Sequence, residues 1–218
     1  MRDAYHDELD AISGLLVEMT NLVGSAMSRA TTALLDADLH LAETVITADA
    51  QVDELYREVE ERAFDLMARQ QPVASDLRIL VTSLRMVADL ERMGDLALHV
   101  AKIARRRYPS SAVPPELRST LLEMGHVAEE IVAKAGSVIA GRDVSLAAEL
   151  ERDDDVMDDL HKRLFAVILD DAWQGGTEAA IDITLAGRYY ERFADHAVSI
   201  AKKVQYLGTG AWQQNTNA

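Results

Sequence analysis

Cysteine is absent from the 218-residue sequence, and proline and glycine are scarce, with 4 and 11 residues. Without cysteine, no disulfide, zinc–thiolate site or thiol nucleophile is possible, and the composition is compatible with a reducing compartment. Proline and glycine most often interrupt helices, so their scarcity favours long helices. The N-terminal stretch lacks an apolar signal region, and no run approaches the roughly 18 apolar residues that span a bilayer. We therefore expect a cytoplasmic protein.

Positive charge is also in short supply. The sequence has 22 lysines and arginines against 37 aspartates and glutamates, which gives a net charge of −15. A surface of this sign repels nucleic-acid phosphates and anionic lipid headgroups. Direct binding to nucleic acid is therefore disfavoured, and we expect contact with membranes only through partner proteins.

Apolar residues recur at every third or fourth position through most of the chain, which predicts an all-α fold. Hydrophobic residues make up 49% of the sequence, enough for a sizeable core. Short connections between the helices favour antiparallel neighbours. We expect Ser75 and Asp76 to cap the third helix. Six helices are predicted, at about residues 5–35, 39–69, 75–108, 116–140, 144–173 and 178–207.

Several motifs occur twice in the sequence. The motif Asp-x-x-Leu-Ala begins at Asp38 and again at Asp143, 105 residues later, and Glu-Arg-x-x-Asp begins at Glu91 and again at Glu191. Matched helices and motifs with one short deletion indicate an internal duplication. We therefore predict two tandem three-helix bundles related by a pseudo-twofold axis. The predicted boundaries are a first repeat at 1–108, a linker at 109–115, a second repeat at 116–207 and a polar tail at 208–218.

The duplicated motifs place pairs of acids on the predicted helices. Two acids four residues apart lie on one helix face, with Cβ atoms about 6 Å apart. The Glu91/Asp95 and Glu191/Asp195 pairs lie on or beside the apolar stripe, where uncompensated carboxylates are costly unless a cation lies nearby. If neighbouring helices place their pairs at the same level, each half presents four carboxylates. The eight candidate metal ligands are Glu91, Asp95, Glu191, Asp195, Asp49, Asp53, Asp154 and Asp158.

A site made only of carboxylate oxygens favours Mg²⁺, Mn²⁺, Ca²⁺ or iron, and carboxylates can bridge two or more ions. Zinc is disfavoured. His99 lies one turn beyond Asp95, but its counterpart in the second repeat is Ser199, so we do not expect it to be a ligand. We expect His196 to point away from the acids. Four methionines are interpreted as core residues: Met86, Met93, Met124 and Met157.

Two alternatives remain open on this pattern. Arg92 and Arg192 could neutralise the acids, which would make the protein a metal-free helical scaffold. A carboxylate-bridged di-metal oxidase would need two Glu-x-x-His motifs, and the sequence has one match, at Glu123 and His126. Gly-rich phosphate loops and Ser-His-Asp arrangements are not seen in the sequence. We therefore expect that the protein is not an enzyme.

Two stretches of the sequence resemble the PhoU family. They are Arg-Gln-Gln-Pro-x-x-Ser-Asp-Leu-Arg at 69–78 and Glu-Arg-x-Gly-Asp at 91–95, with a second Glu-Arg-x-x-Asp in the last helix. The resemblance extends over about residues 5–207. The second copy departs from the first by Ala194 in place of Gly94 and by the lack of a proline before the last helix.

This resemblance implies a cytoplasmic, often dimeric accessory protein of bacterial phosphate transport that binds metal, such as iron or another divalent ion, through the paired acids. It implies two partners, the ATPase of the phosphate ABC transporter and a sensor histidine kinase. The implied role is to report phosphate sufficiency and to keep phosphate-starvation genes off.

Overall fold

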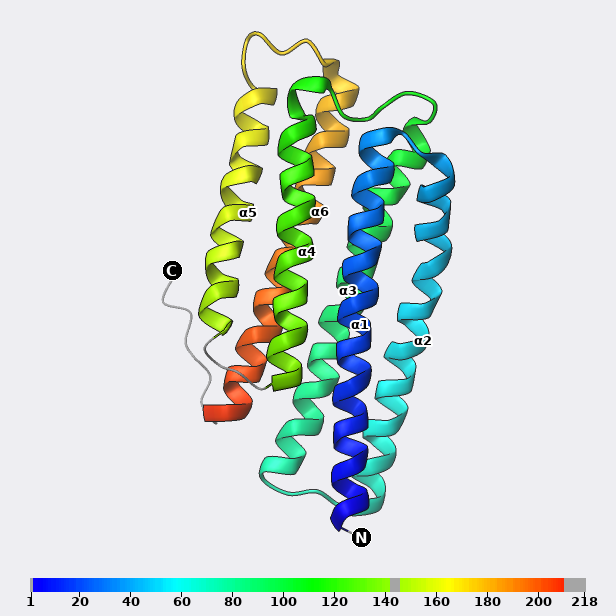
Figure 1. Ribbon diagram of the computed structural model, residues 1–218, viewed down its shortest axis with the longest axis vertical. Coiled ribbons are helices and arrows are strands. Elements are labelled where there is room, and N and C mark those ends of the chain that lie inside the picture. The colour runs from blue at the N-terminus through cyan, green and yellow to red at the C-terminus, as the bar shows by residue number, and fades with distance from the viewer. Residues whose placement is uncertain (1, 142–145, 210–218) are drawn as a thin grey trace.

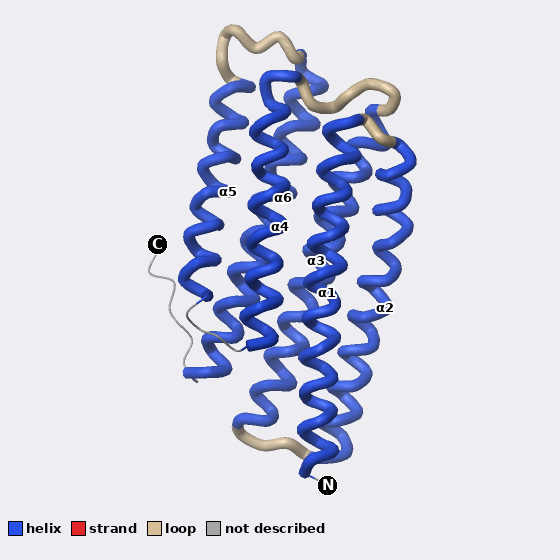
Figure 2. Tube along the Cα trace, in the orientation of Figure 1, coloured by secondary structure: helices blue, strands red, loops and turns tan. Residues whose placement is uncertain are grey.

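The structure is a computed structural model that describes residues 2–141 and 146–209. Within these residues the chain forms six α-helices and a short 3₁₀ helix, without any strand (Figures 1 and 2). None of these helices has the length and apolar character needed to cross a membrane. The elements are α1 (Arg2–Asp36), α2 (Leu39–Gln70), α3 (Ser75–Arg107), η1 (Pro115–Leu117), α4 (Arg118–Gly141), α5 (Ala147–Ile168) and α6 (Gly176–Thr209).

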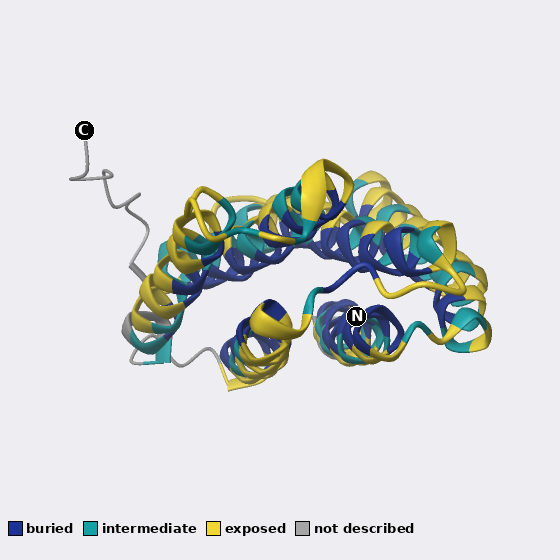
Figure 3. Cartoon of the chain, turned by 90° about the horizontal axis from the view of Figure 1, so that it is seen from above, coloured by how far each residue is buried: buried dark blue, intermediate teal, exposed yellow. Residues whose placement is uncertain are grey.

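The helices form two three-helix bundles that lie side by side. Helices α1, α2 and α3 contact one another, as do α4, α5 and α6, and the halves meet through contacts of α1 with α4 and of α3 with α6. Seen from above, α1 and α4 lie in one layer and α3 and α6 in a second, with α2 and α5 at opposite edges (Figure 3). The predicted all-α fold of two tandem bundles is confirmed.

Local contacts and backbone conformation mark the end of α1 and the starts of α2 and α3. Ala37 adopts a left-handed conformation after α1, and the Asp38 carboxylate then caps α2 by accepting a hydrogen bond from the Leu41 amide at 2.9 Å. The prediction that Ser75 and Asp76 cap α3 is wrong. Ala74 occupies the N-cap position and makes no side-chain capping bond. Asp76 lies in the first turn, where its negative charge interacts favourably with the helix dipole.

The predicted bounds of the later helices needed larger corrections. Helix α5 ends at Ile168 rather than near Trp173 because the Asp170 carboxylate accepts a hydrogen bond from the Ala172 amide at 2.8 Å and holds a turn. The expected start of this helix near residue 144 and most of the expected tail, residues 210–218, lie outside the described residues. The stretch 115–117 forms η1 before α4 begins.

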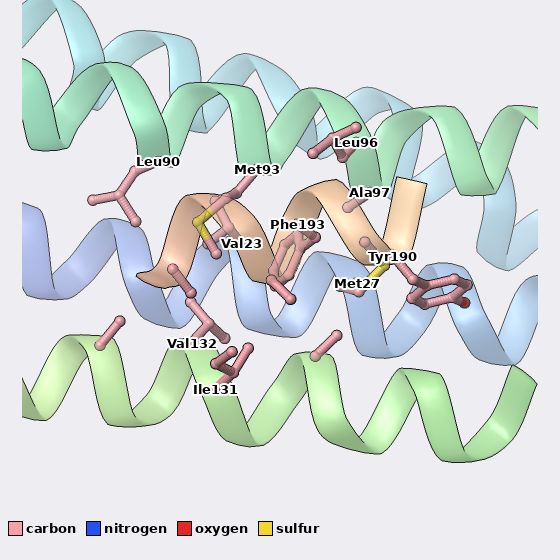
Figure 4. Close-up of a cluster of buried hydrophobic side chains, with 14 of the residues drawn as sticks. Val23, Met27, Leu90, Met93, Leu96, Ala97, Ile131, Val132, Tyr190 and Phe193 are labelled. Atoms are coloured by element: carbon pink, nitrogen blue, oxygen red, sulfur yellow. The ribbon is translucent and has the colours of Figure 1, made fainter. Parts of the chain in front are cut away.

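One continuous core extends through both halves. Side chains from the four central helices α1, α3, α4 and α6 interdigitate there, as Figure 4 shows for Met27, Met93, Val132 and Phe193. Burial of this apolar surface is the main stabilising contribution to the fold. The four methionines interpreted as core residues are all buried, which confirms that interpretation: Met86, Met93, Met124 and Met157.

Helices α1 and α4 approach each other closely where small residues face each other. A Cβ atom added at Gly125 would lie 2.6 Å from Thr31, and one added at Gly136 would lie 2.6 Å from Thr20. Thr31 also forms a buried hydrogen bond of 2.7 Å with the hydroxyl of Tyr190 on α6. Glycine at these positions therefore permits a short distance between α1 and α4 that larger residues would not allow.

Candidate metal site

The first acidic cluster consists of Asp49 and Asp53 on α2 and of Glu91 and Asp95 on α3. These helices are antiparallel neighbours, and their acidic pairs lie close enough to repel one another. A Cβ atom added at Gly94 on α3 would lie 3.3 Å from an oxygen of Asp49, so the missing side chain lets this carboxylate approach the α3 backbone. The structure thus brings all four predicted acids of the first half together.

The second acidic cluster repeats this arrangement in the other half. It consists of Asp154 and Asp158 on α5 and of Glu191 and Asp195 on α6. Asp154 is half-buried, and its carboxylate is repelled by the carboxylates of Asp195, Asp158 and Glu191. The structure therefore also brings together the four predicted acids of the second half.

Burial and mutual repulsion both raise the pKa of acids in these clusters. Burial is the larger cause at Asp49 and Asp154, and the neighbouring carboxylates add to it, so the pKa of each rises to about 6. Burial and then the aspartate one turn further on raise the pKa of Glu91 and of Glu191. Each cluster therefore concentrates negative charge that a cation would neutralise.

The two glutamates lie beside the core, as the apolar stripe predicted. The side chain of Glu91 is 25% exposed and that of Glu191 is 15% exposed. Three of the other acids are half-buried and three are exposed. The half-buried ones are Asp49, Asp95 and Asp154, and the exposed ones are Asp53, Asp158 and Asp195.

Arginine neutralises only part of this charge. Arg92 pairs with Glu91 at 3.5 Å and with Asp95 at 3.1 Å. In the second half, the arginine that pairs with Glu191 is Arg188, one turn earlier, and not Arg192 as the motif suggested. Among the described residues, no ion pair is formed by Arg192 or by either of the aspartates with the most strongly raised pKa.

The clusters consist of oxygen donors, the set that Mg²⁺, Mn²⁺, Ca²⁺ and iron accept. Within residues 2–141 and 146–209, no three acidic or histidine side chains converge closely enough to hold one ion. The side chains of Asp and Glu rotate about single bonds, so their carboxylates have other positions available on the same backbone.

His99 and His196 both contact residues that do not belong to the acidic clusters. His99 stacks on the ring of Tyr189 from α6, with ring centroids 5.2 Å apart and an interplanar angle of 24°. His196 points toward α3, as expected, where its Nδ1 lies 3.1 Å from Asp89. Glu123 and His126 are both exposed on α4, which carries no acid of either cluster. This position does not favour the oxidase alternative.

Sequence reasoning missed a polar network that joins the two halves. Asp89 on α3 contacts both His196 and Lys203 on α6, and Lys203 also donates a hydrogen bond to Ser199 at 2.6 Å. Burial alone would raise the pKa of Asp89, but the hydrogen bonds from His196 and Lys203 outweigh burial and lower it. The partners lie more than 100 residues apart in the sequence, so no local pattern indicated this contact.

A second ionic contact joins the end of α3 to the start of α6. Asp182 is buried on α6 and pairs with Arg106 and, at 3.2 Å, with Arg107 of α3. Arg107 also pairs with Glu178 at 2.5 Å. An acid within the apolar stripe of the last helix was the signal that could have indicated Asp182.

Comparison with known proteins places these features in a family. The family model described as PhoU domain matches the chain twice, over residues 16–104 and 121–204. The phosphate-specific transport system accessory protein PhoU homolog 2 of Mycobacterium tuberculosis is 52% identical over 97% of this chain and 100% of the relative. PhoU homolog 1 of Mycobacterium leprae is 49% identical over 99% of this chain and 97% of the relative.

A solved structure has the same fold over its whole length. The crystal structure of PhoU from Pseudomonas aeruginosa superposes with a TM-score of 0.85, at 31% sequence identity, and covers 95% of this chain and 100% of that chain. The curated relatives are named as accessory proteins, which supports the prediction that this chain is not an enzyme. With both repeats matched and high identity along nearly its whole length, the chain belongs to the PhoU family.

Proposed function

We propose that this chain is an accessory protein that regulates phosphate uptake and represses the phosphate-starvation response when phosphate is plentiful. The observation that carries this proposal is the 52% identity over the full length of a relative named as an accessory protein of the phosphate-specific transport system. The match includes both repeats, so the proposal concerns the whole chain and not one bundle of it.

We further propose that each acidic cluster binds one or more oxygen-preferring metal ions. The support is chemical: four carboxylates from two helices, raised pKa values, and no ion pair at Asp49 or Asp154 among the described residues. A bound ion would supply positive charge and hold the carboxylates of facing helices together. The acids of the first cluster would then fix α2 on α3, and those of the second would fix α5 on α6.

As partners we propose the transporter ATPase, a sensor histidine kinase and a second copy of the chain in a homodimer. The name of the relatives supports a partner in the transport system. The net charge of −15 suits docking on basic surfaces, because charge complementarity speeds association and selects partners. The kinase and the homodimer rest on the family resemblance.

The test of this function is a phosphate-starvation reporter in phosphate-replete cells that lack the gene. Because Mycobacterium tuberculosis has relatives named homolog 1 and homolog 2, the host strain should lack any second copy. We expect the deletion to switch the reporter on and the wild-type gene to switch it off again. A reporter that stays silent in such a strain would count against the regulatory role.

The same strain tests the acidic clusters. A variant with Glu91→Gln, Asp95→Asn, Glu191→Gln and Asp195→Asn keeps the shape of each side chain and removes four charges. A control variant removes four exposed charges outside the clusters, by changing Glu54, Glu61, Glu129 and Glu130 to Gln. We expect the control to restore repression and the cluster variant, at equal protein level, to fail. Equal repression by both would favour the metal-free scaffold.

A further inference from the structure

The surface between α3 and α6 contains a hollow of about 410 Å³, which we name the central hollow. Among the residues that the structure describes, its lining includes three arginines and one carboxylate, in a protein whose net charge is −15. Guanidinium groups so close together repel one another, and an anion between them would offset that repulsion. The lining residues that matter here are Arg92, Arg188, Arg192, His99, Tyr189 and His196.

The duplication explains how the arginines meet. Arg92 and Arg192 hold the same position in the two copies of Glu-Arg-x-x-Asp. Because α3 and α6 pack against each other in opposite directions, equivalent residues near their middles come together across the boundary between the halves (Figure 1). The acids of the motif belong to the two acidic clusters, and both of its arginines line the central hollow together with Asp95.

The three arginines differ in how far they are already neutralised. Asp95, the one carboxylate among the described residues of the lining, is paired with Arg92 at 3.1 Å, and Arg188 is paired with Glu191. Within the described part of the chain, Arg192 forms no ion pair, although it is exposed at the hollow. Its guanidinium therefore has hydrogen-bond donors available for a ligand, in the forked geometry that matches two oxygens of one phosphate.

Aromatic rings also line the hollow, and contacts between side chains hold them in place. His99 from α3 stacks on Tyr189 from α6, and the contact of His196 with Asp89 fixes a second imidazole ring. A planar aromatic surface beside guanidinium groups provides stacking as well as charge. A volume of about 410 Å³ lies within the range of small-molecule sites, which favours a small ligand over a protein segment.

We propose that the central hollow binds a small phosphate-bearing anion, either inorganic phosphate or a phosphate ester, with Arg192 as the principal contact and Arg92 and Arg188 beside it. This inference rests on the geometry of the hollow and not on the proposed regulatory function. It also assigns a role to Arg92 and Arg192, the arginines of the duplicated motif, that metal binding by the acidic clusters does not explain.

The test is calorimetric titration of the purified full-length protein with orthophosphate, pyrophosphate and adenosine monophosphate, in buffers of equal ionic strength. We expect at least one of them to bind with a Kd below about 1 mM. Tighter binding of adenosine monophosphate would assign the hollow to phosphate esters through stacking on Tyr189. Tighter binding of the inorganic ions would assign it to free phosphate.

Variants locate the binding. Arg192→Gln should weaken binding at least about tenfold, since it removes a charge-assisted contact. Arg192→Lys should weaken it less, because it keeps the charge and loses the fork. Arg105→Gln removes an exposed charge at the end of α3 and should leave binding unchanged.

Three results would overturn the proposal. They are equal binding by Arg192→Gln and Arg105→Gln, no binding of any of the three anions, and Arg192-dependent binding of a glutamate-rich peptide alone. The last result would identify a docking site for an acidic protein instead. Because Arg192 is exposed, thermal melts of the variants should match the wild type and exclude loss of folding.

Discussion

At the scale of single residues, Asp49 and Asp154 differ most from ordinary surface acids. Each has a pKa raised to about 6 by burial and by neighbouring carboxylates, against 3.8 for an aspartate without these neighbours. In metal-free protein the folded state therefore binds more protons than the unfolded state between these two values. The contribution of these two aspartates to stability is largest below the unfolded pKa and is lost as the pH rises through the folded pKa.

Removing one of these charges should therefore stabilise the metal-free protein. In the presence of a chelator at pH 7.5, we expect Asp49→Asn to raise the free energy of unfolding by on the order of 1 kcal/mol, after allowance for solvent screening. The gain should be smaller at pH 5, where folded Asp49 is already largely protonated. Urea unfolding at the two pH values measures both quantities.

The control for this prediction is Glu54→Gln, which removes an exposed acid from the same helix. It should leave the stability nearly unchanged at both pH values. An equal gain from both variants would show that net charge rather than the first acidic cluster governs the effect, and a gain that grows toward pH 5 would contradict the raised pKa of Asp49.

The positions of the eight acids could be predicted because helical spacing fixes which residues share a face. The pairing of the arginines could not. Arg188 and Arg192 both lie within one turn of Glu191, so their side-chain conformations decide between them, and the sequence carries no signal for that choice. The central hollow was missed for a related reason, since it depends on contacts between α3 and α6.

At the scale of helices, hydrophobic periodicity predicted all six elements, because the 3.6-residue repeat is long and rarely interrupted here. The errors lie at helix ends. The early end of α5 depends on the turn that Asp170 holds, and the uncapped start of α3 depends on the backbone at Ala74. Such ends depend on single backbone conformations, which periodicity does not report.

The close approach of α1 and α4 gives a prediction with an internal control. Gly125→Ala would place a methyl group 2.6 Å from Thr31, which is held by hydrogen bonds to Met27 and Tyr190. We expect it to lower the free energy of unfolding by about 1–3 kcal/mol. Gly14→Ala meets nothing within 4 Å and should raise it by roughly 0.5–1 kcal/mol.

Thermal or denaturant unfolding of the two alanine variants measures this difference directly. Both substitutions improve helix propensity to the same degree, so the difference between them reports the α1–α4 contact alone. If Gly125→Ala were as stable as Gly14→Ala, the two helices could separate without cost, contrary to the packing described.

At the scale of the whole molecule, each acidic cluster links an outer helix to a central one, α2 to α3 and α5 to α6. The two clusters lie in different halves, so metal binding at one should not require the other. We expect wild-type protein dialysed against Mn²⁺ to retain metal and to melt at a higher temperature than chelated protein, because an ion that binds only the folded state stabilises it.

Removing the charges of one cluster should then remove about half of the bound metal and part of the thermal stabilisation. We expect Glu91→Gln with Asp95→Asn to lose about half of the bound metal, measured by elemental analysis, and to keep part of the rise in melting temperature. Loss of all metal from this variant would mean that the clusters are coupled. Wild-type protein without retained metal would contradict the metal proposal itself.

The hydrogen bond between Thr31 and Tyr190 has an evolutionary consequence, because it joins the first copy of the duplicated unit to the second inside the core. Each copy completes the interior of the other, so neither remains a separate unit of inheritance that recombination could exchange or delete alone. Selection therefore acts on the pair, and the copies have diverged in a complementary way where they touch, because Thr20 and Thr31 of the first copy correspond to Gly125 and Gly136 of the second.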